Sequence, residues 1–85
     1  MAGKRIGEVT HYFDRIGVAV IVLSDNIAKG DRIHFLGHGS DFDQEVASMQ
    51  IEHESIDSAK RGDEIAISVI KPVKRNTAVF LITEE

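Results

Sequence analysis

An uninterrupted apolar run from Val18 to Leu23 constrains the fold of this chain more than any other feature. Side chains alternate along a strand, so one face would carry Val18, Val20 and Val22 and the other Ala19, Ile21 and Leu23. Because both faces are apolar, we expect a central strand or one that is covered on both sides. The run is far shorter than the roughly 20 residues of a membrane-spanning helix, which predicts a soluble, cytoplasmic protein with no membrane partner.

The chain before this run is also typical of a strand. Residues 6–23 are rich in Ile, Val, Thr, Tyr and Phe and are interrupted near Asp14 and Arg15, where two polar residues could form a hairpin tip. With 85 residues and no cysteine, the chain has room for one domain, residues 1–85, whose small core is not supplemented by disulfides or thiolate–metal bonds. An opening hairpin in a single small domain is therefore expected.

A short motif occurs twice: a cation, then Gly-Asp, then an isoleucine two residues after the glycine–aspartate pair. Its copies are Gly30-Asp31 and Gly62-Asp63. Glycine permits the positive φ of a tight turn, and the aspartate accepts a hydrogen bond from a nearby backbone N–H. What lies between the copies does not repeat, so we interpret the motif as one turn used twice to enter a strand.

The segment between the two motifs is ambiguous. Apolar residues from Phe42 to Ile56 recur at helical spacing, and Asp41 and Gly62 could cap a helix of about 20 residues. Ala47, Met49 and Ile51 also alternate as they would in a strand. Periodicity alone does not decide between the two structures.

Charge restricts the partners. Ten Lys and Arg against fourteen Asp and Glu give a formal charge of −4, which opposes avid binding to nucleic acid phosphates. A local basic surface is still compatible with this, because cations bunch near the second motif and around the only proline, at Lys60, Arg61, Lys71, Lys74 and Arg75. Ordinary solvation of loops explains the same bunching.

The sequence shows no catalytic pattern. It has no G-x-x-x-x-G-K-[ST] loop for a nucleotide and no evident Ser-His-Asp arrangement, so we predict no enzyme, no cofactor and no catalytic residue. His34 and His38 are four residues apart, but their segment runs from a strand into a glycine loop, which removes the geometry of a metal site. His11 or His53 could instead contribute to a ligand-facing patch.

The order of these features resembles the second domain of the translation factors related to elongation factor Tu and elongation factor 1-alpha. The residues that carry the resemblance are Gly30-Asp31, Gly37, Val46-Ala47-Ser48-Met49, Glu52-His53-Glu54 and Ala59-Lys60-Arg61-Gly62-Asp63. The resemblance covers nearly the whole chain, from about Gly7 to Ile82. A similar barrel lies at the C-terminal end of a family of collagenase-like peptidases, several of which act in RNA modification.

The resemblance implies an all-β fold: a six-stranded closed antiparallel β-barrel of the translation-protein type. Residues 42–53 would then be a strand, and only Ile56 to Arg61 would form a short helical turn, ended by Gly62. The core would consist of Ile6, Val9, Val18, Val20, Val22, Ile33, Phe35, Val46, Met49, Ile51, Ile65, Ile67, Val69, Val79 and Leu81.

The implied function is a non-catalytic, elongation-factor-like module that contacts tRNA, rRNA or a ribonucleoprotein. The five cations named above would bind the nucleic acid, and His53 and Glu64 would face a ligand. One alternative is a protein-interaction domain that accompanies, or is the partner of, a collagenase-like peptidase or an RNA-modifying enzyme. Another is a carrier of a metal or small ligand bound through the histidines.

Overall fold

The structure is a computed structural model that describes residues 2–83, and every regular element in that range is a β-strand. The strands are β1 (Ala2–Phe13), β2 (Val18–Leu23), β3 (Ile27–Ala28), β4 (Arg32–Gly37), β5 (Ser40–Glu45), β6 (Met49–Ile51), β7 (Glu54–Ile56), β8 (Ser58–Ala59), β9 (Glu64–Ser68) and β10 (Ala78–Thr83). The all-β prediction is confirmed. Within the described residues there is no helix of the length and apolar character that crossing a membrane requires.

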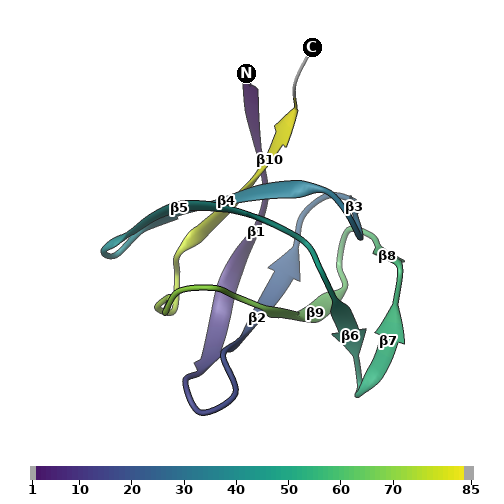
Figure 1. Ribbon diagram of the computed structural model, residues 1–85. Coiled ribbons are helices and arrows are strands. Elements are labelled where there is room, and N and C mark those ends of the chain that lie inside the picture. The colour runs from purple at the N-terminus through teal and green to yellow at the C-terminus, as the bar shows by residue number, and fades with distance from the viewer. Residues whose placement is uncertain (1, 84–85) are drawn as a thin grey trace.

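Eight strands form one antiparallel sheet in the order β5-β4-β10-β1-β2-β9-β6-β7, and β3 pairs with β8 in a separate two-stranded sheet (Figure 1). The predicted opening hairpin is present: β1 pairs with β2 around a turn at residues 14–17, in which Gly17 has a φ of 64°. On its other side β2 pairs with β9. The apolar run is therefore a central strand, as its composition indicates.

The closed barrel of six strands is not confirmed. The sheet has eight strands, and in the part of the chain that the structure describes, its two end strands, β5 and β7, do not pair with each other. The chain passes from one end of this strand order to the other after β5. β5 pairs with β4, residues 46–48 form no strand, and β6 then pairs with β9. Residues 42–53 are thus largely extended, but they form two strands and a turn.

The expected helical turn from Ile56 to Arg61 is wrong. β7 ends at Ile56, and β8 follows at Ser58–Ala59. The backbone of β8 pairs with β3, in the register Ile27 opposite Ala59. This pairing uses in a β-ladder the backbone groups that a helical turn would need, so tertiary contacts override the local pattern.

A buried glutamine side chain connects β5 to the end of β9, where no backbone ladder joins them. The Gln44 side chain is only 6% exposed. Its Nε2 donates to the Ser68 carbonyl at 2.8 Å, and its Oε1 accepts from the Ile70 N–H at 2.9 Å. This one amide therefore joins the two segments by two hydrogen bonds, as pairs of backbone hydrogen bonds join neighbouring strands elsewhere in the sheet.

Most predicted core residues are buried within the folded sheet: Ile6, Val9, Ile33, Phe35, Val46, Met49, Ile65, Ile67 and Val79, with Ile51, Val69 and Leu81 packed against them. Phe35 stacks on Phe42, with ring centroids 5.0 Å apart. These residues give the small domain one continuous core.

The prediction that Val18, Val20 and Val22 of β2 lie in the core is wrong. Ala19, Ile21 and Leu23 are buried, while Val18 and Val20 are half-buried and Val22 is exposed. The register with β9 explains the choice, because Ala19 lies opposite Ile67 and Ile21 opposite Ile65, which are both in the core. An alternating pattern with two apolar faces does not by itself say which face turns inward.

Candidate functional site

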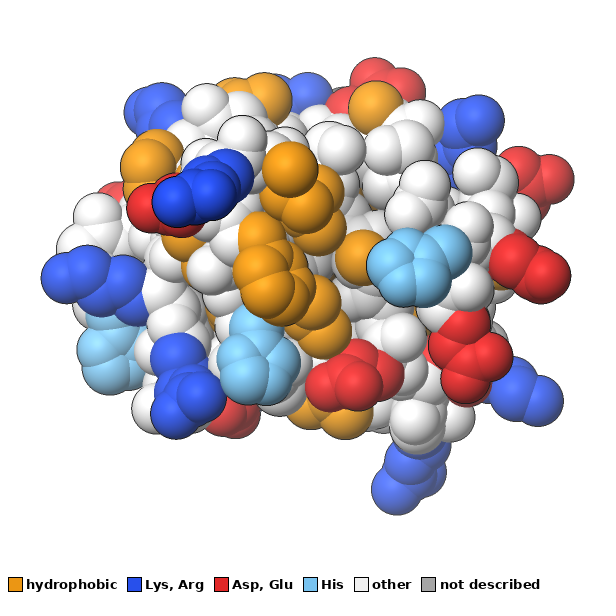
Figure 2. All heavy atoms as spheres, turned by 90° about the horizontal axis from the view of Figure 1, so that it is seen from below, with side chains coloured by type: hydrophobic (Ala, Val, Ile, Leu, Met, Phe, Trp, Pro, Cys, Tyr) orange, Lys and Arg blue, Asp and Glu red, His pale blue; other side chains and the backbone are white. Residues whose placement is uncertain are grey.

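A groove lies between the tip of the β1–β2 hairpin and the β6–β7 hairpin, over the outward face of β2, β9 and β6. We call it the groove throughout, and its lining includes Phe13, Ile16, Val18, Val20, Gln50, Ile51, Glu52, His53, Glu64 and Ala66. Figure 2 views the molecule from this end, and apolar side chains form a stripe across the face with histidines and carboxylates beside it. The outward valines of β2 thus form part of the floor of a concavity.

Large apolar side chains around the groove are exposed to solvent. Phe13 is 50% exposed and Ile16 is 69% exposed. Ile70, at 68%, lies close to the same hairpin tip, because the neighbouring Val69 N–H donates to the Gly17 carbonyl. A contiguous apolar patch of this kind is typical of a site that binds another protein or a ligand.

The rim of the groove is acidic. Glu52 and His53 form the two-residue connection between β6 and β7, and their φ angles of 50° and 68° have the signs of a type I′ turn. Glu64 begins β9, and its carboxylate accepts from the Thr10 hydroxyl at 3.4 Å. The structure therefore brings the two predicted ligand-facing residues, His53 and Glu64, to one site. Their contact with a ligand stays a prediction.

The five predicted cations fall into two groups. Lys60 and Arg61 lie in the turn before β9, whereas Lys71, Lys74 and Arg75 lie in the segment after it, so the length of β9 separates the groups. Lys71 Nζ lies 5.7 Å from the centre of the Phe42 ring, and Arg75 Nε donates to the Thr10 carbonyl at 3.2 Å. None of the five lines the groove. Their binding of a ligand stays a prediction.

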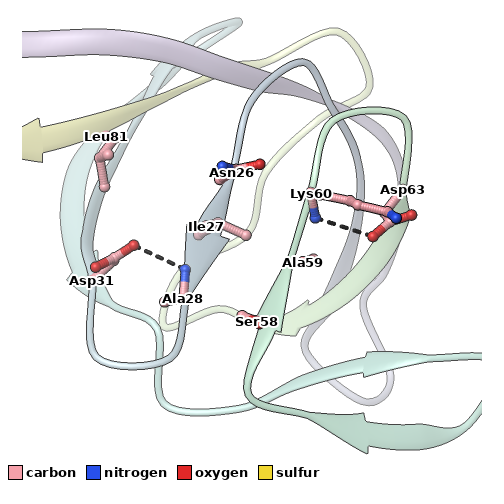
Figure 3. A pocket seen from close by; sticks show the side chains of 9 residues that line it. All are labelled: Asn26, Ile27, Ala28, Asp31, Ser58, Ala59, Lys60, Asp63 and Leu81. Atoms are coloured by element: carbon pink, nitrogen blue, oxygen red, sulfur yellow. Dashed lines mark hydrogen bonds between the residues drawn. The ribbon is translucent and has the colours of Figure 1, made fainter.

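The repeated Gly-Asp motif forms two equivalent turns beside a second hollow (Figure 3). Asp31 Oδ2 accepts from the Ala28 N–H at 2.9 Å, and Asp63 Oδ2 accepts from the Lys60 N–H at 3.0 Å. Gly30 and Gly62 have φ angles of 96° and 92°. These contacts confirm the turn interpretation. Because β3 and β8 pair antiparallel, the two turns leave the two-stranded sheet at opposite ends, an arrangement that the sequence did not indicate.

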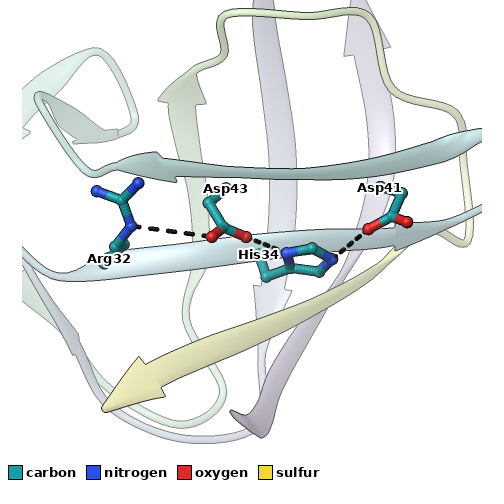
Figure 4. Close-up of polar contacts among 4 residues, drawn as sticks. All are labelled: Arg32, His34, Asp41 and Asp43. Carbon is teal, nitrogen blue, oxygen red and sulfur yellow. Dashed lines mark hydrogen bonds and ion pairs between the residues drawn. The ribbon is translucent and has the colours of Figure 1, made fainter. Parts of the chain in front are cut away.

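A cluster of polar side chains lies on the outward face of β4 and β5, away from the groove (Figure 4). His34 Nδ1 contacts Asp43, and its Nε2 lies 2.9 Å from Asp41 Oδ1. Arg32 Nε is 3.9 Å from the other oxygen of Asp43. In the part of the chain that the structure describes, no group of three or more His, Asp or Glu side chains, this cluster included, is placed so that it could hold a metal ion.

We expect His34 to make the stability of the fold depend on pH. The hydrogen bond to Asp43 raises the pKa of His34 above its usual value, and Asp41 adds to the effect. The protonated ring stabilises the folded chain, so this contribution is complete below about pH 6.5 and is lost as pH rises through the raised pKa. We expect the free energy of unfolding of wild type, relative to His34→Gln, to fall as pH rises above neutrality.

Urea unfolding at a series of pH values measures this difference. A His11→Gln variant, which makes the same substitution at an exposed histidine on β1, is the matched control. An unchanged profile in His34→Gln would show that the ring does not carry a proton linked to folding.

Comparison with known proteins changes the interpretation of the fold. No protein-family model matches the chain. It is 31% identical, over 80 residues, to an uncharacterized protease of Methanocaldococcus jannaschii; the match covers 93% of this chain and 20% of that protein. The chain therefore spans about a fifth of the length of this curated relative.

Two crystal structures share the fold. Both are of the C-terminal domain of a Geobacillus thermoleovorans protein assigned to the U32 peptidases, one of them its selenomethionine variant. The variant has a TM-score of 0.86 at 20% identity, covering 89% of this chain and 96% of that one. The other has a TM-score of 0.88 at 19% identity, covering 94% and 93%.

These findings correct the prediction of an elongation-factor-like, RNA-binding module. The matched sequence is that of a protease, and the matched structures are domains from the C-terminal end of a U32 peptidase. The motifs that carried the resemblance, above all the two Gly-Asp turns, fix backbone geometry in a small β-domain. They therefore report the fold and not the pathway in which it is used.

Proposed function

We propose that this chain is a non-catalytic protein-interaction module that docks on the catalytic part of a U32-type peptidase, either within the same protein or as a separate partner. The observation that carries the proposal is the similarity of nearly the whole chain to one fifth of a protease. The shared fold with two domains from the C-terminal end of a U32 peptidase supports it. A module that accompanies a larger enzyme needs a docking surface.

The groove provides such a surface. A central strand with two apolar faces normally has both faces covered. Here one face of β2 lies in the core, and the outward face, with Val18 and Val20, lines an open groove beside exposed Phe13 and Ile16. Burying that face against another protein would remove apolar area from water and favour association.

The contacts of His34 agree with a non-catalytic role. A general base must have a free ring nitrogen within reach of the substrate proton. Both nitrogens of His34 are already directed at carboxylates, Nδ1 at Asp43 and Nε2 at Asp41. The arrangement suits a structural ion cluster on the sheet better than proton transfer.

The direct test is binding to the Methanocaldococcus jannaschii protease from which the stretch matching this chain has been deleted. Calorimetry and size-exclusion chromatography are expected to show a 1:1 complex. The full-length protease is the matched control, and it should bind this chain less because its own stretch occupies the docking surface. Absence of binding to the folded, truncated protease would contradict the proposal.

Deletion could leave the truncated protease insoluble, and a second measurement covers that case. A chimera that carries this chain in place of the deleted stretch is expected to be soluble and to unfold in one cooperative transition, because a docked module stabilises the surface it covers. A chimera as insoluble as the truncated protease would also count against the proposal.

A further inference from the structure

We infer that the segment of the partner that fills the groove carries a lysine or arginine next to its apolar side chains, with the cation placed between Glu52 and Glu64. This inference rests on the proposed function and specifies the chemistry of the partner. Both carboxylates line the groove together with its apolar floor, whereas the third acidic residue of the lining, Asp63, already accepts from the Lys60 N–H. A partner that covers the floor must therefore approach both of them.

The cost of desolvation is the physical reason for a cation. Glu52 and Glu64 are exposed in the isolated domain, so water satisfies their charges. A purely apolar partner would exclude that water and leave two carboxylate charges without a counter-charge, with only the Thr10 hydroxyl beside Glu64, which is strongly unfavourable. A cation from the partner replaces the lost hydration, and the apolar side chains beside it can then reach Val18 and Val20.

The backbone conformation at Glu52 supports a binding role for the rim of the groove. A two-residue type I′ connection favours Asn-Gly or Asp-Gly, because both residues need positive φ. Here the two positions are Glu52 and His53, with φ angles of 50° and 68°. A residue other than glycine with a positive φ costs conformational energy, and such residues are concentrated at functional sites.

The same charges argue against nucleic acid in the groove. Glu52 and Glu64 would repel phosphates, and the nearest cations of the sequence motif, Lys60 and Arg61, do not line the groove. The chain also has a formal charge of −4. Phosphate-dominated binding depends on neutralising many backbone charges, so a polypeptide with apolar and cationic side chains fits the groove better.

The test uses the truncated Methanocaldococcus jannaschii protease as the probe and measures its affinity for three forms of the full chain. These are wild type, the double variant Glu52→Gln/Glu64→Gln, and the control Glu45→Gln/Asp57→Asn. The control removes the same two charges from exposed positions outside the groove. Affinities are measured at about 50 mM and about 300 mM salt, where screening lengths differ more than twofold.

The rim variant is expected to bind roughly three- to tenfold more weakly than wild type at the lower salt concentration, and to lose most of the salt dependence of binding. The control should stay within about twofold of wild type at both concentrations. Equal or tighter binding by the rim variant would overturn the inference and leave the proposed function standing. Competition by tRNA for the same surface would also overturn it. A wild-type chain that binds no protease at all would instead contradict the proposed function itself.

Discussion

Replacing Phe13 with alanine is expected to weaken binding to the truncated protease at least about thirtyfold, and to leave the fold of the domain intact. Exposed aromatic residues at the centre of an apolar patch commonly contribute about 2 kcal/mol or more to an interface, which corresponds to that change in affinity. Phe13 is 50% exposed at the end of β1 and lines the groove. Its ring is half covered and stacks with His11, with centroids 6.3 Å apart, so its loss should lower the free energy of unfolding by only about 1 kcal/mol. Calorimetry measures the affinity, and urea unfolding measures the stability.

The matched control is Leu36→Ala. Leu36 is 45% exposed, nearly as much as Phe13, but it lies on β4, outside the groove. We expect its removal to leave the affinity unchanged. Equal loss of binding in the two variants would mean that general hydrophobicity, and not the groove, attracts the protease. Unchanged binding in both would move the docking surface elsewhere.

Replacing Gln44 with alanine is expected to lower the free energy of unfolding by about 2–4 kcal/mol, because it leaves two backbone groups without partners. These groups are the Ser68 carbonyl and the Ile70 N–H, which now bond to the Gln44 amide at 2.8 and 2.9 Å. A domain of this length has roughly 4–13 kcal/mol of stability in total. The variant should therefore melt roughly 10–25 °C below wild type in circular dichroism or calorimetry.

Gln50→Ala is the control for this loss. Gln50 is an exposed glutamine on β6, and its side chain makes no comparable bond in the part of the chain that the structure describes. We expect the midpoint of urea unfolding of this variant to stay close to that of wild type. If Gln44→Ala were equally mild, the bridge between β5 and the end of β9 would not hold the sheet together, and water would take its place.

Much of the fold could be predicted from local chemistry. The hairpin at Asp14 and the two Gly-Asp turns follow from turn chemistry, and each is present. Long-range pairing was harder to predict. The helical turn expected after Ile56 is absent because β8 pairs with β3. The expected closed barrel is not confirmed, and between β5 and the end of β9 the Gln44 side chain takes the place of a backbone ladder. Neither contact leaves a periodic signal in the sequence.

The candidate site was predicted only in part. The sequence pattern of β2 correctly shows that both faces are apolar, but assigning Val18, Val20 and Val22 to the core hid the groove. His53 and Glu64 were expected to face a ligand and do lie at one rim. Phe13 and Ile16 were missed, although large apolar residues next to a polar hairpin tip are themselves a signal of an exposed binding surface.

Comparison with other proteins favours the alternative that the sequence offered, a module that accompanies a collagenase-like peptidase, over a translation-factor module. A Gly-Asp turn before an isoleucine strand serves backbone geometry, through the positive φ of the glycine and the hydrogen bond that the aspartate accepts. Such motifs do not distinguish a translation factor from a peptidase. Similarity over 93% of the chain to one protease does favour the peptidase setting.

Methyl NMR of the labelled chain, with and without the truncated protease, tests most directly whether the uncovered face of β2 is the docking surface. If it is, the methyl signals of Val18, Val20 and Ile16 will shift or broaden when the protease is added, and those of Leu36 on β4 will not. Changes confined to the methyl groups of β4, or methyl signals in the groove that stay unchanged at saturating protease, would contradict this placement of the docking surface.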